Sequence, residues 1–195
     1  MIGLIFGPPG SGKGTQAARI SEELHLAHLS TGEILRAEMA RGSRLGKEVE
    51  RIVSAGDLVP DDLMDQVVEG RLDQVGEPPG VLLDGFPRTV EQARALDAML
   101  ARRGSQVSFL LALEAPEELL TERLLKRAAK EGRVDDTKGV IEERMREYHH
   151  RTEAVLDYFR RNGVPVLGVD GVGSVEEVFE RIREVLEDPQ SWSSR

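Results

Sequence analysis

Short runs of apolar residues recur along the chain, and most of them show no alternation between polar and apolar positions. Strands that are covered on both faces have this continuously apolar pattern, which is typical of a parallel sheet. The exception is the brief second candidate, His28–Leu29. The predicted strands are Ile2–Phe6, His28–Leu29, Val81–Leu83, Val107–Leu113 and Val164–Val169.

Longer segments with apolar residues three and four positions apart lie between these runs and predict helices. Several begin at a residue whose side-chain oxygen can cap free N–H groups: Ser30 or Thr31, Asp61, Thr89 and Ser174. The alternation of strands and helices predicts an α/β protein with a parallel five-stranded sheet and helices on both faces. The predicted helices are Lys13–Leu24, Glu33–Arg41, Leu45–Ala55, Asp61–Leu72, Thr89–Arg103, Pro116–Lys130, Lys138–Arg161 and Val175–Leu186.

Two stretches do not fit this alternation. Ser30–Leu72 holds three helical patterns in succession with no strand between them. Ala128–Thr137 is short and polar, with Gly132 inside it and Gly139 close behind. Both are predicted to leave the core, as segments that cover a ligand site do.

The composition excludes several classes of protein. The 195 residues fit one domain, and 39% hydrophobic with 31% charged residues is the balance of a folded globular protein. The net charge of −9 argues against a general nucleic-acid binder. Zero cysteines exclude disulfides and thiolate zinc sites. With no signal peptide and no apolar stretch of ~20 residues, we expect a cytoplasmic protein without a membrane partner.

A glycine-rich segment joins the first predicted strand to the first predicted helix. Over residues 7–15 it is Gly-Pro-Pro-Gly-Ser-Gly-Lys-Gly-Thr. Glycines let successive N–H groups converge on one anion, and the helix that follows points its positive end at the same place. Lys13 adds a full charge, while Gly14 stands where such loops usually have Ser or Thr. A turn that only reverses the chain does not need this lysine, so we interpret the segment as a nucleotide phosphate loop.

Four motifs, in order, resemble those of the adenylate kinases. The first is the loop over residues 7–16, which matches the family even in the glycine after the lysine. The others match the helix of the family's monophosphate site, its most diagnostic internal motif and its spacing of arginines: Leu29-Ser30-Thr31-Gly32 with Arg36, Asp84-Gly85-Phe86-Pro87-Arg88, and Arg123, Arg127, Arg133 and Arg144. This resemblance runs from Ile2 to about Leu186. It implies a phosphate-loop kinase fold and reversible, magnesium-dependent transfer of a phosphoryl group from ATP to AMP, giving two ADP.

The resemblance implies an ATP site at the phosphate loop. Arg123 would lie against the base, Arg127 would contact the phosphates, and Gly173 would contact the base through its backbone. Asp84 ends an apolar run, where a carboxylate would orient Mg²⁺ through water. The implied ATP-site residues are Gly10, Ser11, Gly12, Lys13, Gly14, Thr15, Arg123, Arg127 and Gly173.

A second site, for AMP, is implied as well. Thr31 and Gln92 match the positions that recognise adenine in the acceptor, whereas relatives acting on UMP or CMP usually have Ala and Asn there. Arg36 would bind the AMP phosphate. The implied AMP-site residues are Thr31, Arg36, Asp57, Leu58, Val59, Gly85, Phe86, Pro87, Arg88, Gln92, Arg133 and Arg144.

Phosphoryl transfer requires in-line positioning, charge neutralisation and exclusion of water rather than covalent help from the protein. Arginine suits this task because its planar fork binds phosphate oxygens in pairs and stays charged. The expected catalytic residues are therefore Lys13, Arg88, Arg123, Arg127, Arg133 and Arg144. Four neighbouring charges are expected to be surface residues instead: Glu142, Glu143, Arg146 and Glu147.

The resemblance also implies how the single domain is organised. The core would comprise residues 1–29, 60–125 and 137–187, followed by a flexible tail over 188–195. An AMP-binding region would span about 30–59 and a short lid about 126–136. Such a lid is too short for the extended form and lacks cysteines, so no zinc is expected. The expected partners are ATP, AMP and ADP, and we expect a monomer.

Two alternative functions stay open on the sequence alone. A phosphate-loop switch or nucleotide-sensing module would carry guanine motifs such as Asn-Lys-x-Asp, which are absent, and would not need Arg88. A kinase with another acceptor is the second alternative. Thr31 and Gln92 argue against UMP or CMP as that acceptor, and the motif over residues 84–88 argues against a small metabolite alcohol.

Overall fold

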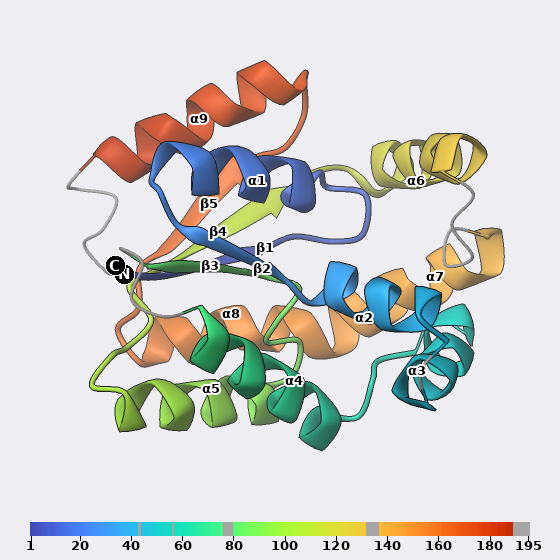
Figure 1. The fold of residues 1–195 in the computed structure, drawn as a ribbon. Coiled ribbons are helices and arrows are strands. Elements are labelled where there is room, and N and C mark those ends of the chain that lie inside the picture. Colours follow the sequence, from blue (N-terminus) through green and yellow to red (C-terminus); the bar gives the residue numbers. More distant parts are fainter. Residues whose placement is uncertain (43, 56, 76–79, 132–136, 189–195) are drawn as a thin grey trace.

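The computed structural model describes residues 1–42, 44–55, 57–75, 80–131 and 137–188 (Figure 1). Its strands are β1 (Ile2–Phe6), β2 (Ala27–Ser30), β3 (Val81–Asp84), β4 (Phe109–Glu114) and β5 (Val166–Asp170). Its helices are α1 (Lys13–Glu23), α2 (Thr31–Ala40), α3 (Arg44–Ala55), α4 (Asp61–Gln74), α5 (Val90–Arg102), α6 (Glu117–Glu131), α7 (Lys138–Glu147), α8 (Glu153–Arg161) and α9 (Val175–Glu187).

The five strands form one parallel sheet in the order β2-β3-β1-β4-β5, which confirms the predicted fold class. The central strand β1 pairs with β3, with Ile5 opposite Asp84, and with β4, with Phe6 opposite Ala112. Parallel pairing brings the carboxyl ends of these strands to one edge, where ligands of open α/β sheets bind. The phosphate loop after β1 and the motif after β3 are therefore neighbours.

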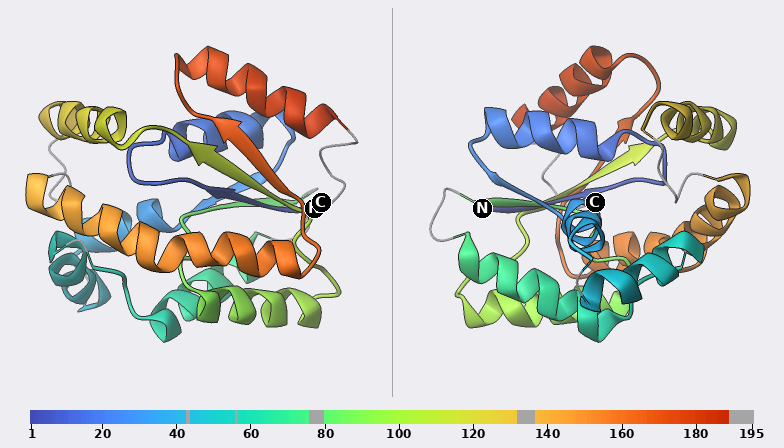
Figure 2. Two further views of the ribbon diagram at one scale, coloured as in Figure 1. Left: turned by 180° about the vertical axis from the view of Figure 1, so that it is seen from behind. Right: turned by 45° about the vertical axis from the view of Figure 1, so that its right-hand side comes forward.

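Helices cover both faces of the sheet (Figures 1 and 2). Side chains of β1 alternate between the faces: Leu4 joins the core beneath α4, α5 and α8, while Ile5 joins the core beneath α1 and α9. Both are almost completely buried. Because successive strand residues point to opposite faces, a strand buried on both must be apolar at every position. That requirement explains the unbroken apolar runs of the sequence.

The predicted element boundaries differ from the structure at several points. β4 and β5 begin two residues later than predicted, at Phe109 and Val166. The helix predicted over Lys138–Arg161 is interrupted by a π-helical turn at Tyr148–Thr152, so it becomes α7 and α8. The sequence pattern did not reveal this turn, because one wide turn hardly changes the apolar spacing.

Most of the predicted helix caps are present. Ser30 accepts a hydrogen bond from the Glu33 N–H (3.4 Å), Thr89 caps α5, and Ser174 forms a reciprocal capping box with Glu177. The prediction that Asp61 caps a helix is wrong. α4 begins after Pro60 without a side-chain cap, and the Asp61 carboxylate accepts hydrogen bonds from another helix instead.

Asp65 in α4 provides a test of how charge affects stability. Burial and repulsion from Asp61, Asp62 and Glu69 raise the pKa of Asp65 to about 6, above the ordinary value of 3.8. The folded protein thus holds this proton more tightly than the unfolded chain, and ionisation costs stability as pH rises from about 4 to 6. We expect Asp65→Asn to raise the free energy of unfolding by about 1 kcal/mol at pH 7.5, after allowance for partial solvent exposure. Urea denaturation at pH 7.5 and 4.5 measures this, and an equal gain at both pH values would contradict the assignment.

Candidate active site

The phosphate loop owes its shape to glycines in left-handed conformations. Gly10 and Gly12 have φ angles of 85° and 86°, a region that L side chains rarely adopt. A Cβ at Gly10 would also lie 2.6 Å from the Leu120 carbonyl oxygen. Gly12 precedes the first residue of α1 and brings no capping side chain. The loop and the positive end of α1 therefore form a surface suited to an anion.

Lys13 is the first residue of α1 and lies among several charges. Burial lowers the pKa of Lys13 to about 8; Asp84 opposes this shift, whereas Arg88, Arg144 and Arg127 add to it. The ammonium group is thus held where positive charge is already in excess. A polyanionic ligand would relieve this repulsion, which is the electrostatic condition for phosphate binding.

Asp84 ends β3 beside the phosphate loop and is only 7% exposed. Burial alone would raise the pKa of Asp84, but His28 and the charges of Lys13 and Arg88 hold it below the ordinary value. The His28 Nε2 atom lies 3.7 Å from Asp84 Oδ2. A Cβ at Gly14 would lie 3.4 Å from the same oxygen. The site therefore contains one ionised carboxylate at the start of α1.

This carboxylate is suited to magnesium. Mg²⁺ dehydrates reluctantly and usually binds through one or two carboxylates, retained waters and substrate phosphates. Asp84 supplies such a carboxylate on the wall of the large cavity described next. No group of three acidic, histidine or cysteine side chains able to hold a metal occurs within the described residues. The donors present thus fit a metal that arrives with nucleotide phosphates.

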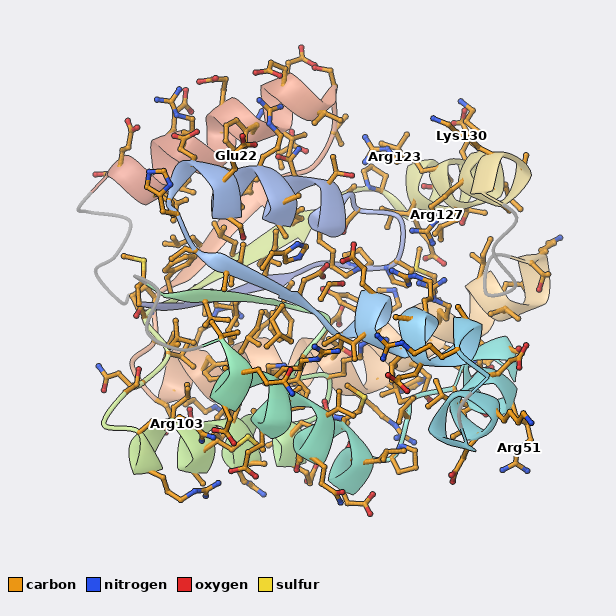
Figure 3. All side chains as sticks on the ribbon, viewed as in Figure 1. Glu22, Arg51, Arg103, Arg123, Arg127 and Lys130 are labelled. Atoms are coloured by element: carbon orange, nitrogen blue, oxygen red, sulfur yellow. The ribbon has the colours of Figure 1, made fainter. Side chains whose placement is uncertain are left out.

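A cavity of about 620 Å³ opens in front of the phosphate loop. Figure 3 shows Arg123 and Arg127 on α6 near the start of α1, with Lys130 on the opposite side of that helix. Every residue predicted for the ATP site lies on its wall: Gly10, Ser11, Gly12, Lys13, Gly14, Thr15, Arg123, Arg127 and Gly173. Asp84 lies there too.

Two arginines hold the loop at the far end of this cavity. Arg123 donates to the carbonyl oxygens of Gly171 (3.1 Å) and Gly173 (3.2 Å). Arg181 in α9 donates to the carbonyl oxygens of Asp170 (2.9 Å) and Val172 (2.5 Å). Four successive carbonyls are thus bound alternately by the two side chains. Arg123 was expected to lie against a base, whereas Arg181, which lies in a different helix, was not among the predicted residues.

A second, smaller cavity of about 90 Å³ lies between α2, α3 and the β3 end. Its wall contains most of the residues predicted for the AMP site: Thr31, Arg36, Asp57, Leu58, Val59, Gly85, Arg88, Gln92 and Arg144. Phe86 and Pro87 line a pocket of about 50 Å³ adjoining it. The remaining predicted residue, Arg133, lies outside the described residues. The 620 Å³ and 90 Å³ cavities share Gly32, Arg36, Gly85, Arg88 and Arg144.

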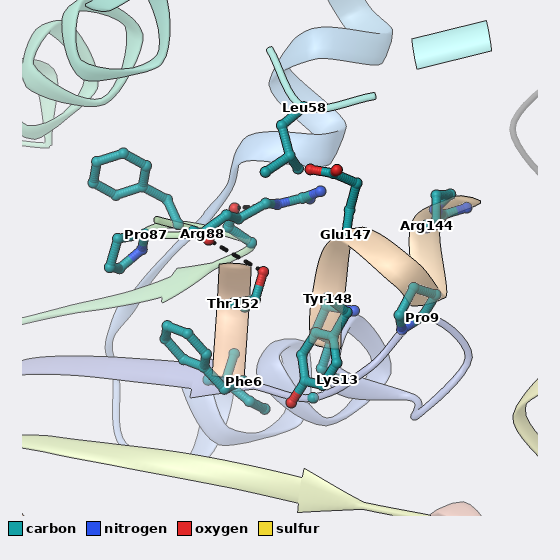
Figure 4. Close-up of a pocket in the computed structure, with 14 residues that line it drawn as sticks. Phe6, Pro9, Lys13, Leu58, Pro87, Arg88, Arg144, Glu147, Tyr148 and Thr152 are labelled. Carbon is teal, nitrogen blue, oxygen red and sulfur yellow. Dashed lines mark hydrogen bonds between the residues drawn. The ribbon is translucent and has the colours of Figure 1, made fainter. Parts of the chain in front are cut away.

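The backbone of Arg88 is fixed on both sides, and Figure 4 shows the contact with Thr152. Its N–H donates to Gln92 Oε1 (2.7 Å), and its carbonyl oxygen accepts from Thr152 Oγ1 (3.2 Å) in the π-helical turn. The guanidinium is oriented by a hydrogen bond from Arg88 Nε to the Gly85 carbonyl oxygen (2.8 Å). Arg88 is therefore a preorganised cation at the boundary between two cavities.

The two residues predicted to recognise a base already make hydrogen bonds within the protein. Thr31 Oγ1 donates to the Asp84 carbonyl oxygen (3.2 Å), and Ser30 rather than Thr31 is the helix cap. Gln92 binds Arg88 through Oε1 and Asp61 through Nε2 (2.7 Å each). Both residues are nearly buried, with exposed fractions of 1% and 2%.

The expectation that Glu147 is a surface charge is wrong. Its side chain is 18% exposed and lines the small pocket with Arg88 and Arg144, as Figure 4 shows. Glu147 also forms an ion pair with Arg151 (Arg151 Nε to Glu147 Oε2, 3.2 Å). Its position follows from the course of α7 across the site, which charge spacing along the sequence does not reveal.

Several other contributions were also missed by sequence reasoning. His28 beside Asp84 and Thr152 beside Arg88 join residues far apart in the chain. The one signal that could have indicated Thr152 is the π-helical turn, a feature frequent at functional sites.

In the part of the chain that the structure describes, no helix is long and apolar enough to span a membrane.

Comparison with known proteins identifies the family. The family model described as adenylate kinase matches residues 5–164. A protein named adenylate kinase from Micrococcus luteus is 47% identical over 183 residues, which is 94% of this chain and 89% of that relative. One from Stenotrophomonas maltophilia is 44% identical, covering 92% and 95% of the two chains, and one from Phocaeicola vulgatus is 43% identical, covering 94% and 97%.

These matches cover the phosphate loop, the motif after β3 and the arginines of α6 and α7 that the geometry brings together. The general reaction of the family is magnesium-dependent phosphoryl transfer between ATP and AMP. The parallel sheet and the paired cavities agree with the match. This chain belongs to the adenylate kinase family and is a phosphotransferase of the nucleoside monophosphate kinase type.

Proposed function

We propose that the chain transfers a phosphoryl group from ATP in the larger cavity to AMP in the smaller one, reversibly giving two ADP. The observation that carries this proposal is the shared wall of the cavities, which contains Arg36, Arg88 and Arg144. Two polyanions repel each other, so their transfer site needs cations between them. A switch or sensing module has no use for a second cavity with such a wall.

The proposed roles follow from position. Lys13 and Arg127 neutralise the ATP phosphates, and Arg123 orients the loop at the base end together with Gly173. Arg88 and Arg144 act on the transferring group, and Arg36 holds the AMP phosphate. Asp57, Leu58 and Val59 form the wall that faces the acceptor. Arg133 is proposed to join them from the lid.

Magnesium is the proposed cofactor, with no zinc. Asp84 would hold it through water, and the metal would supply positive charge to the nucleotide phosphates. The chain's own contribution is to keep this carboxylate ionised, which His28, Lys13 and Arg88 favour. Removal of magnesium by a chelator is expected to stop turnover without unfolding the protein.

The proposed organisation is a core with two covers, an AMP-binding region at about 30–59 and a short lid at about 126–136. It is supported by the position of α2 and α3 beyond the sheet edge (Figure 2). Closure of both covers would exclude water, which otherwise attacks the transferring group. We further propose a cytoplasmic monomer that acts on ATP, AMP and ADP without nucleic acid or membrane. This rests on the family alone.

A coupled assay of ADP formation tests the function. With Mg-ATP as donor, turnover should be rapid with AMP and much slower with GMP, CMP or UMP. A bisubstrate dinucleotide that spans both cavities should inhibit competitively against each substrate. Turnover confined to UMP or CMP would overturn the acceptor assignment, and hydrolysis or binding without any acceptor dependence would overturn the reaction.

Replacement of Gln92 by alanine tests the acceptor pocket. Gln92 lines the smaller cavity and not the larger one, as far as the described residues show. We expect Gln92→Ala to raise KM for AMP about tenfold or more, since a lost buried hydrogen bond costs on the order of 1–3 kcal/mol. KM for ATP should change less than twofold. Steady-state kinetics with each substrate varied in turn measures this, and equal effects on both would contradict the placement.

A further inference from the structure

Asp61 makes two short hydrogen bonds to α5 from the first turn of α4. Its Oδ2 atom accepts from Thr89 Oγ1 (2.8 Å), and its Oδ1 atom accepts from Gln92 Nε2 (2.7 Å). Both donors are nearly buried, with exposed fractions of 6% and 2%. A carboxylate bound twice to nearly buried donors on a neighbouring helix is more strongly constrained than a surface charge.

Asp61 determines which way the Gln92 carboxamide faces. An ionised carboxylate can only accept hydrogen bonds, so the amide must turn its NH₂ group toward Asp61. Its oxygen then faces the opposite way and accepts from the Arg88 N–H (2.7 Å). One amide thus connects Asp61 to the backbone of the residue at the boundary of the two cavities. Without the carboxylate, the Arg88 N–H would be the one remaining hydrogen-bond partner among the described residues that selects this amide orientation.

Thr89 forms a second connection between Asp61 and the same turn. Its hydroxyl donates to Asp61 and accepts from the backbone N–H of Gln92 (3.1 Å), as the cap of α5. Because the Thr89 O–H is directed at Asp61, the lone pairs of Thr89 Oγ1 face the N-terminus of α5. Both the backbone and the side chain of Gln92 are therefore positioned with the help of this carboxylate.

We propose that Asp61 is a positioning residue that sets the specificity for the acceptor base by fixing the orientation of Gln92. This inference rests on the proposed placement of Gln92 in the acceptor pocket. Within the described residues Asp61 is not part of the wall of that cavity, whereas Gln92 is. Asp61 acts through Gln92: the remaining N–H and lone pair of the carboxamide can be presented to a purine edge in one arrangement only.

The test uses steady-state kinetics of Asp61→Ala in the full-length chain. We expect KM for AMP to rise about fivefold to tenfold, because a carboxamide held only by the Arg88 N–H is less strictly oriented than one held from both ends. KM for ATP should stay within about twofold, and the ratio of kcat/KM for AMP to that for CMP should fall. The matched control is Asp62→Ala, which removes the same charge from the adjacent, exposed position and should leave all three values unchanged.

A double-mutant cycle distinguishes positioning from general stability. In the Gln92→Ala background, Asp61→Ala should have almost no further effect on KM for AMP, because the residue through which it acts is gone. Asp61→Asn, which retains an acceptor oxygen, should have a smaller effect than Asp61→Ala and also serves if the alanine variant folds poorly. Circular dichroism and thermal unfolding of each variant show whether the fold is retained.

Four results would overturn the inference. Equal increases in both KM values with a lower Tm would show a structural role only. An undiminished effect of Asp61→Ala in the Gln92→Ala background would show that Asp61 acts by another route. If Gln92→Ala alone leaves KM for AMP unchanged, the acceptor pocket is misplaced and the inference fails with it. If Gln92→Ala raises KM for AMP but Asp61→Ala does not, only the role of Asp61 is refuted.

Discussion

Replacement of Lys13 by alanine should lower kcat by about a thousandfold. The ammonium group lies on the wall of the larger cavity, where Asp84, Arg88, Arg127 and Arg144 act on its charge. A preorganised cation in such a place stabilises charge that develops in the transition state, and losing one such donor typically costs 10²- to 10³-fold in rate. Because Lys13 also serves ground-state binding in the proposed mechanism, KM for ATP should rise as well.

The same substitution should not destabilise the fold. Burial lowers the pKa of Lys13 to about 8, so the side chain is still charged at neutral pH but its charged form costs stability in the folded protein relative to the unfolded chain. Tm of Lys13→Ala should therefore equal or exceed that of the unchanged chain at pH 7. The control is Lys47→Ala, an exposed lysine in α3, which should keep full activity. Full turnover in the Lys13 variant would refute its role.

Replacement of Arg88 by alanine should have the second largest effect, a loss of about 10²- to 10³-fold in kcat/KM for AMP. Arg88 contributes to both cavities, and its guanidinium is held in place by the Gly85 carbonyl. Its backbone bonds to Gln92 and Thr152 do not involve the side chain and should survive the substitution. The loss should thus reflect missing charge and geometry rather than a displaced loop.

Arg88→Lys separates charge from geometry. A lysine restores one positive charge but not the planar fork that binds two phosphate oxygens at once. We expect it to recover less than about a tenth of the lost activity. Arg102→Ala, at a solvent-exposed arginine paired with Glu69, is the control and should be fully active. Near-complete rescue by lysine would show that Arg88 acts only as a point charge.

Features encoded locally could be predicted from the sequence. The strand β1 is apolar at every position because both faces are covered, and the loop after it needs glycine where φ is positive. Both constraints restrict the residue types at neighbouring positions of the sequence. The parallel sheet and the phosphate loop followed from them. Family motifs then supplied residues of the second cavity that spacing alone would not have brought together.

Features that depend on contacts between distant segments could not be predicted. Asp61 looks like a helix cap in sequence, yet its carboxylate is bound by residues 28 and 31 positions later. Glu147 looks like one of several surface charges, but the course of α7 turns it toward Arg88. Arg181 supports a loop that its own sequence neighbourhood does not identify. In each case the three-dimensional arrangement, not residue type, decides the role.

The π-helical turn between α7 and α8 aligns two parts of the site that ordinary helix geometry would separate. At about 100° per residue, positions eight apart in an α-helix point roughly 80° away from each other. One residue absorbed in a wide turn reduces that angle to about 20°. Arg144 and Thr152 thus both line the pocket in front of Arg88. The turn is a register shift, so a regular α-helix through the same residues would rotate one end of the helix out of the site while leaving every side chain intact.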